Sequence, residues 1–261
     1  MIQEIKRAKR YAAYLAKSQS DRWLHSPFLF DLYSEVFKAD KSYYSFEPIE
    51  RIRENLIKDT SQITITDFGA GSKKFHGNER KIQDIAKTAL KPAKQCQQLF
   101  RLANYIRPSS IIELGTSLGI TSAYLASANK SISTTTFEGC PEHLKIASRI
   151  WKKLGLTNIT PQLGNLDDTL NKYLDTTDKV DMVFFDANHR YLPTITYFEL
   201  CLPKTHKQSV FVFDDIHWSD EMFKAWNEIK GHPSVTVSID LFHLGILFFD
   251  PALSKQHFVL R

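Results

Sequence analysis

The sequence has no long apolar run. None of its 261 residues lies in a stretch approaching the about 18 consecutive apolar residues of a membrane-spanning helix. The first twenty residues are basic and lack the apolar core of a secretory signal. We therefore expect a cytoplasmic chain without a membrane partner.

Cysteine, glycine and proline are also sparse. Cys96, Cys140 and Cys201 are far apart and lack the spacing of metal ligands, so we expect structural thiols in a reducing compartment. Ten glycines and ten prolines leave no low-complexity linker. The hydrophobic fraction of 43% and the charged fraction of 24% are typical of a globular protein.

Two signatures of nucleotide enzymes are missing. No G-x-x-x-x-G-K-[ST] sequence occurs, which argues against a P-loop enzyme. None of the ten tyrosines is followed four positions later by lysine, which argues against a short-chain dehydrogenase.

Positive charge is concentrated at the start of the chain. Within the first twenty residues, one acid, Glu4, stands against five basic residues: Lys6, Arg7, Lys9, Arg10 and Lys17. Such a cluster is typical either of a contact with nucleic acid or of a solvated helix face. No second basic patch or RNA-binding signature occurs, so we favour the solvated face and expect no nucleic-acid partner.

Residues 1–107 predict a mainly helical N-terminal extension. Helices are expected over 22–38, 47–59, about 79–90 and 93–106, with a short strand-like run at 63–67. The aromatic residues Trp23, Phe30 and Tyr33 could line an apolar pocket, but an ordinary helix–helix core is favoured.

Residues 108–261 predict a Rossmann-like α/β domain. Strand-like runs alternate with helical ones, which indicates a doubly wound parallel sheet. Two further β-rich runs, 234–241 and 244–250, have almost nothing between them and must pair antiparallel. The expected sheet is thus mostly parallel and seven-stranded, with strands at 110–115, 132–139, 159–164, 179–187, 209–215 and the terminal hairpin.

Two glycine loops compete for the role of cofactor loop. A Rossmann-type loop needs a following helix and then a strand that ends in an acid about 20 residues on. After Gly119 this acid is Glu138, whereas the DFGAGS segment at 67–72 has no second strand before residue 110. We interpret DFGAGS as a tight turn, with a role in lining the site as the alternative.

The second loop resembles motif I of the class I S-adenosylmethionine (SAM) dependent methyltransferases. Its E-x-G-x-x-x-G pattern runs from Glu113 through Gly115 to Gly119, and an acid beside the loop suits a ligand without phosphate. The terminal hairpin is similar to theirs too. The resemblance implies that SAM is held by the following residues: Glu113, Gly115, Thr116, Ser117, Gly119, Glu138, Gly139, Asn165 and Asp186.

Acidic residues end two strands that we expect to be neighbours. The run at 179–187 leads to Asp186 and His189, and the run at 209–215 ends in Asp214 and Asp215. Carboxyl ends of parallel strands share one edge of a sheet, so three carboxylates would converge there. A divalent cation, Mg²⁺ or Mn²⁺, would relieve their repulsion. Each aspartate could instead cap the next helix.

This set resembles the divalent-metal-dependent O-methyltransferases of the catechol, caffeoyl-CoA and macrolide-sugar types. The resemblance implies that the metal is held by Asp186, Asp214 and Asp215. Where the catechol type has a general-base lysine this chain has His189, as in the macrolide-sugar type. The resemblance implies that Asp186 and His189 are catalytic, and that a hydroxyl of a small molecule attacks the methyl group of SAM.

Other readings stay open. The chain could be a metal-independent methyltransferase acting on nitrogen, RNA or protein, or a SAM-binding protein without turnover. His217 could support a metal ligand or lie in the core, and Trp218 could pack at the mouth of the site. A homodimer is compatible with the sequence.

Overall fold

The computed structural model describes residues 2–20, 24, 26–66 and 78–261. They form two compact units: unit 1 comprises the described parts of 1–30 and 170–261, and unit 2 comprises those of 31–169. These limits differ from the division at residue 107, which stays a prediction. Trp23 and the DFGAGS segment lie outside the described residues.

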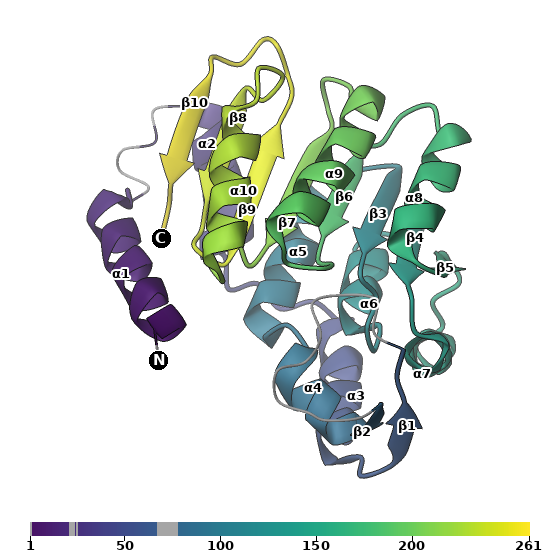
Figure 1. Cartoon of the computed structure of the whole chain (residues 1–261). Coiled ribbons are helices and arrows are strands. Elements are labelled where there is room, and N and C mark those ends of the chain that lie inside the picture. Colours follow the sequence, from purple (N-terminus) through teal and green to yellow (C-terminus); the bar gives the residue numbers. More distant parts are fainter. Residues whose placement is uncertain (1, 21–23, 25, 67–77) are drawn as a thin grey trace. The chain divides into compact units, whose positions relative to one another are not determined.

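Unit 1 is built on five strands in the order β10–β8–β9–β7–β6 (Figure 1). Strand β6 pairs parallel with β7, and β9 pairs antiparallel with both β7 and β8, which confirms the predicted hairpin. Strand β10, which pairs parallel with β8, was not predicted. The bounds are β6 Met182–Phe185, β7 Val210–Asp214, β8 Val237–Asp240, β9 Leu244–Phe248 and β10 Gln256–Val259.

Helices α9 and α10 lie side by side over one face of these strands (Figure 1). Aromatic rings fill the space beneath them: Phe185 and Phe213 stack with their centroids 4.2 Å apart, and Trp226 of α10 is buried. Helix α10 begins after its N-cap Ser219, whose hydroxyl accepts a hydrogen bond from the Met222 amide. The helices are α1 Ile2–Lys17, α2 Pro27–Leu32, α9 Tyr191–Cys201, the 3₁₀ turn η3 Leu202–Lys204 and α10 Asp220–Gly231.

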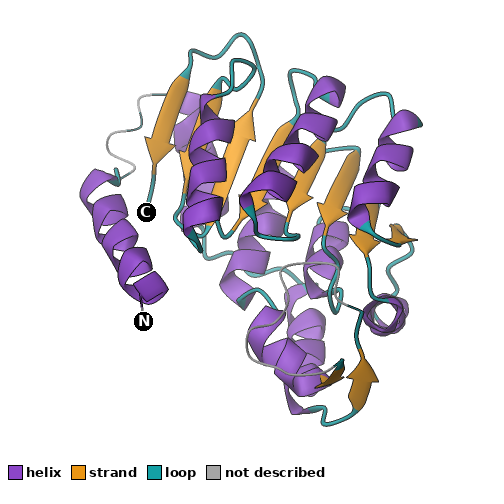
Figure 2. Ribbon diagram, viewed as in Figure 1, coloured by secondary structure: helices purple, strands orange, loops and turns teal. Residues whose placement is uncertain are grey.

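Unit 2 contains three strands that pair parallel, as predicted, and their order is β3–β4–β5. A separate antiparallel pair, β1 with β2, accompanies helices α3 and α4 (Figure 2). The helix expected from residue 79 therefore begins at Ile82, because Glu79 to Lys81 form β2. The bounds are η2 Tyr33–Lys38, α3 Phe46–Lys58, β1 Gln62–Thr64, β2 Glu79–Lys81, α4 Ile82–Ala89, α5 Ala93–Ile106, β3 Ser110–Leu114, α6 Ile120–Ser127, β4 Ser133–Glu138, α7 Pro141–Lys153 and β5 Ile159–Leu163; α8, Leu166–Asp175, crosses the unit limit.

The predicted fold class, a mostly parallel Rossmann-like α/β fold with an antiparallel hairpin, is confirmed. Strands β3 to β10 number eight rather than the predicted seven, because the short, half-polar segment Gln256–Val259 is also a strand. Along the described part of the chain, no helix is both long and apolar enough to cross a membrane.

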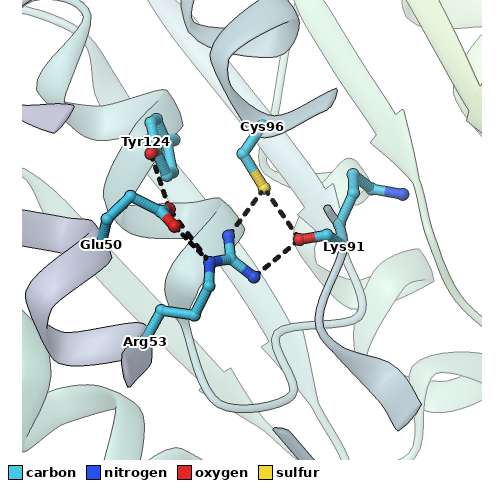
Figure 3. A network of polar contacts seen from close by, with 5 residues as sticks. All are labelled: Glu50, Arg53, Lys91, Cys96 and Tyr124. Carbon is cyan, nitrogen blue, oxygen red and sulfur yellow. Dashed lines mark hydrogen bonds and ion pairs between the residues drawn. The ribbon is translucent and has the colours of Figure 1, made fainter. Parts of the chain in front are cut away.

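A buried polar network joins three helices of unit 2 (Figure 3). The Arg53 Nε of α3 donates to both carboxylate oxygens of Glu50 at 2.9 and 3.0 Å, and its Nη1 donates to the Lys91 carbonyl at 2.7 Å. The Tyr124 hydroxyl of α6 donates to Glu50 at 2.8 Å, and Arg53 Nη2 lies 3.5 Å from the Cys96 sulfur of α5. Burial raises the pKa of Cys96 to about 11, so the thiol is neutral and Glu50 balances the charge of Arg53.

Candidate active site

The predicted site residues fall into two sets, one in each unit. In unit 2 the chain leaves β3 through a loop in which three residues have positive φ: Gly115 at 104°, Ser117 at 49° and Gly119 at 75°. The amides of Gly115 and Thr116 both donate to the Phe137 carbonyl, at 3.1 and 3.0 Å. The loop is thereby fixed against the end of β4.

Gly119 lets helix α7 approach the loop. A Cβ atom at Gly119 would lie 2.6 Å from the Ala147 Cβ and 2.8 Å from the Trp151 Nε1. The Trp151 Nε1 donates to the Gly119 carbonyl at 2.9 Å. In the described structure, Gly119 thus serves the turn and the close packing of α7, as the last glycine of a dinucleotide loop does.

Glu113 lies inside a buried hydroxyl network. Its side chain is fully buried, and Oε2 accepts hydrogen bonds from the hydroxyl of Thr136, at 2.6 Å, and from that of Ser122. Thr136 also lies 2.6 Å from the hydroxyl of Thr116 in the loop. Glu113 therefore connects β3 with β4 and α6, and it reaches the glycine loop through the hydroxyls of Thr136 and Thr116.

Glu138 ends β4 and contacts the loop directly. One carboxylate oxygen accepts the Ser117 amide at 2.7 Å, and the other accepts the Cys140 amide at 2.9 Å, on the far side of Gly139. The oxygen that accepts from Cys140 also lies 3.5 Å from the His143 Nδ1, whereas the oxygen that accepts from Ser117 keeps a lone pair for a further donor such as a ribose hydroxyl. This donor set fits the predicted contact with SAM.

Asn165 caps a helix. Its side-chain oxygen accepts the Asp167 amide at 3.2 Å, and its carbonyl accepts the Thr169 amide at 3.0 Å at the start of α8. The predicted contact with adenine stays a prediction.

The acidic set lies in unit 1, where β6 and β7 run parallel with Phe185 beside Phe213. The next residues, Asp186 and Asp214, therefore lie at the same strand edge. One ligand atom from each of Asp186, His189 and Asp214 lies within 4.8 Å of the other two. The predicted convergence at these strand ends is thus present for two carboxylates and one imidazole.

Neighbouring negative charges rather than burial determine the direction in which the pKa of His189 shifts. Burial alone would lower the pKa of His189, but Asp186, whose Oδ1 lies 3.5 Å from Nε2, and Asp214 outweigh it and raise the pKa to about 9. The charge of Asp215 acts in the same direction. Without a bound cation the imidazole is therefore protonated at neutral pH.

Asp215 lies outside this three-residue group. It adopts a left-handed backbone with φ 52°, and its amide donates to the His243 carbonyl at 2.8 Å. The third member of the group, beside Asp186 and Asp214, is His189. A role of Asp215 as a metal ligand stays a prediction.

The loop that carries His189 is held by α10. Asn188 and His189 have φ values of 66° and 34°, a conformation that non-glycine residues rarely adopt. Immediately afterwards the Tyr191 amide donates to the Glu221 carboxylate at 2.9 Å, and the Tyr191 hydroxyl donates to Glu228 at 2.6 Å. The acids of α10 were not predicted, because their pairing crosses from one helix to the next without a sequence motif.

The segment after Asp215 is anchored as well. His217 is buried, and its Nε2 lies 2.8 Å from the Asp240 carboxylate, so it belongs to the core. Trp218 is half exposed, with the Arg7 guanidinium 4.9 Å from its ring centre. Its predicted place at the mouth of the site stays a prediction.

Comparison with solved structures gives the class of fold. Similar chains include the O-methyltransferase TomG from Streptomyces achromogenes in complex with SAM (18% identity, 84% of this chain and 95% of that chain, TM-score 0.57). They include an O-methyltransferase from Bacillus cereus in complex with S-adenosylhomocysteine, SAH (15% identity, 83% of this chain and 94% of that chain, TM-score 0.54). They also include an SAH-bound methyltransferase from Podospora anserina (13% identity, 81% of this chain and 99% of that chain, TM-score 0.56). The fold is that of SAM-dependent methyltransferases.

The sequence agrees with the fold. Residues 112–216 match a family model described as a methyltransferase domain, and this segment includes the glycine loop, Glu138, Asp186 and Asp214. No curated protein matched the chain significantly. The predicted resemblance to class I methyltransferases is confirmed in the fold and over the matched segment.

Proposed function

We propose that this chain transfers the methyl group of SAM to a hydroxyl oxygen of a small molecule, and that a divalent cation, Mg²⁺ or Mn²⁺, assists the reaction. The observation that carries the metal-dependent part is the convergence of Asp186, Asp214 and His189 at the ends of two adjacent parallel strands. TomG and the Bacillus cereus protein, which have this fold, are both described as O-methyltransferases.

The donor atoms of unit 2 suit SAM better than a dinucleotide. Glu113 lies two residues before the first glycine of the loop, where a carboxylate would repel a pyrophosphate. SAM carries hydroxyls and positive charge but no phosphate. Glu138, through the oxygen that accepts from the Ser117 amide, would accept a ribose hydroxyl, while Gly115 to Gly119 hold the shape of the loop.

The donor atoms of unit 1 suit a hard divalent cation. We assign Asp186 and Asp214 as its ligands, since carboxylate oxygens are preferred by Mg²⁺ and Mn²⁺. When bound, the cation would lower the pKa of the acceptor hydroxyl. It would also offset the charges that raise the pKa of His189, so that Nε2 could accept the hydroxyl proton near neutral pH.

Methyl transfer from SAM to a panel of hydroxylated small molecules tests this function. We expect SAH to form in the presence of Mn²⁺ or Mg²⁺ and formation to stop with EDTA. His189→Gln should bind the cation but lower kcat about 100-fold or more, the usual contribution of a general base. If His189→Gln instead lost the cation, His189 would be a ligand rather than the base.

Turnover that ignores EDTA would contradict the metal-dependent proposal and favour the metal-independent alternative on nitrogen, RNA or protein. SAM binding without turnover on any acceptor would favour a non-catalytic SAM-binding protein. Two of the five basic residues of helix α1, Lys6 and Arg10, pair with Asp220 at 2.6 Å, which reduces the charge that a nucleic-acid arm could use.

A further inference from the structure

Unit 2 contains a cavity that the glycine loop does not use. Its volume is about 420 Å³, and it lies beside η2 and the C-terminal half of α5. Six residues line it: Glu35, Tyr43, Arg101, Asn104, Tyr105 and Arg107. None of them belongs to the residues assigned to SAM or to the cation.

Arg101 is a buried cation that forms no ion pair among the described residues. Its side chain and backbone together are only 4% exposed. Its Nε donates to the Val36 carbonyl at 2.9 Å and its Nη1 to the Lys41 carbonyl at 3.3 Å, and in the described structure no carboxylate forms an ion pair with it. A buried guanidinium is costly unless it is paired, so its retention beside a cavity calls for a ligand.

The electrostatics agree with this view. Burial lowers the pKa of Arg101 more than the neighbouring Tyr43 and Asp40 raise it, so the charge is undercompensated. The one acid among the six lining residues, Glu35, is already paired with Lys41 at 2.5 Å. Asp40 acts on Arg101 only through its electrostatic field, so the charge of the guanidinium is offset in part and without a hydrogen-bonded acid.

The remaining lining residues provide hydrogen-bond donors. Arg107 follows α5 with a left-handed backbone, φ 54°, and is exposed. Burial and nearby acids raise the pKa of Tyr105, so its hydroxyl stays protonated. Asn104 adds an amide, and the ring of Tyr43 packs on Phe100 with centroids 4.7 Å apart, which fixes one wall.

We propose that this cavity binds a compact oxyanion, the phosphate or carboxylate group of a small molecule, through the guanidinium groups of Arg101 and Arg107. The Asn104 amide and the Tyr105 hydroxyl donate further hydrogen bonds to it. The proposal stands independently of methyl transfer, since it involves none of the residues assigned to that reaction.

Calorimetric titration of the full chain with inorganic phosphate and with acetate tests the proposal. Chloride at the same ionic strength serves as the blank, because screening alone changes exposed charges. We expect saturable binding of at least one oxyanion. Arg107→Gln, an exposed position, should weaken it about tenfold, as the loss of one charge-assisted hydrogen bond does.

Arg101→Gln should abolish binding of the oxyanion. If the Arg101→Gln variant does not fold, the affinity of Arg107→Gln tests the proposal by itself. Arg51→Gln is the matched control, since Arg51 is 70% exposed on α3 and pairs with Glu47 only. Binding of phosphate but not acetate would identify a phosphate ligand, and the reverse a carboxylate. No saturable binding above chloride, or equal weakening by Arg51→Gln, would overturn the proposal.

Discussion

At the scale of single residues, His189 carries the most information about the acidic site. It sits in a left-handed backbone conformation, its Nε2 faces Asp186, and three carboxylates act on its charge. Its raised pKa follows from the crowding of anions that the proposed cation would neutralise. The titration of this imidazole therefore reports on the site without any substrate.

In the metal-free protein we expect His189 to titrate near pH 9 in an NMR pH series. Its folded pKa lies above its ordinary value of 6.5, so the imidazolium stabilises the fold fully below about pH 6.5 and loses this effect as the pH rises through 9. Asp186→Asn should lower the pKa of His189. A titration at or below 6.5 in the native protein would show that the carboxylates do not act on it.

Gly119 is a position at which the fold tolerates an added side chain poorly, because its φ is positive and a Cβ atom would overlap with α7. We expect Gly119→Ala to lower the free energy of unfolding by roughly 2 to 5 kcal/mol, from the positive φ and the overlap with Ala147. Gly155→Ala is the control: its φ is 67°, yet nothing lies within 4 Å of the new Cβ, so only about 1 kcal/mol should be lost. Urea unfolding measures both, and equal losses would contradict the packing argument.

At the scale of elements, polar contacts between helices rather than sequence motifs hold the helices that carry the site. In unit 1, Glu221 and Glu228 of α10 fix Tyr191, the residue at which α9 begins two positions after His189. In unit 2, Glu50 and Arg53 connect α3 to α5 and to α6, the helix that follows the glycine loop (Figure 3).

The Arg53 network gives a prediction at this scale. Arg53→Gln removes a buried guanidinium and leaves the Glu50 carboxylate, whose side chain is 26% exposed, without its cation; the free energy of unfolding should fall by about 3 kcal/mol. Arg51→Gln, on the same helix, removes an exposed pair with Glu47 and should change it by less than about 0.5 kcal/mol. Thermal and urea unfolding compare the two, and similar losses would show that the network adds no stability.

At the scale of the whole molecule, the main sheet followed from the sequence where its signals were strong. The antiparallel pairing of β8 and β9 was predictable because no helix fits into the connection. Strands β2 and β10 were missed, since each is only three or four residues long and carries polar side chains. The local sequence pattern does not distinguish such strands from loops. Whether such a segment becomes a strand depends on its pairing with a strand elsewhere in the chain.

The candidate site was predictable to the same degree. The strand-end rule placed Asp186 and Asp214 together, and the structure agrees. The rule could not show that Asp215 adopts a left-handed backbone conformation and that His189 is the third member of the group. The φ angle of a single residue cannot be inferred from the sequence pattern. The cavity around Arg101 has no sequence signature, since its lining comes from η2, the residues after it and α5.

The central claim is that Asp186 and Asp214 form a cation site in a SAM-dependent methyltransferase, and calorimetric titration with Mn²⁺ tests it most directly. We predict one site in the native chain, weakened at least about tenfold by Asp186→Asn and by Asp214→Asn. The exposed control Asp178→Asn should bind as the native chain does. No Mn²⁺ binding by the native chain, or equal binding by all four proteins, would contradict the account.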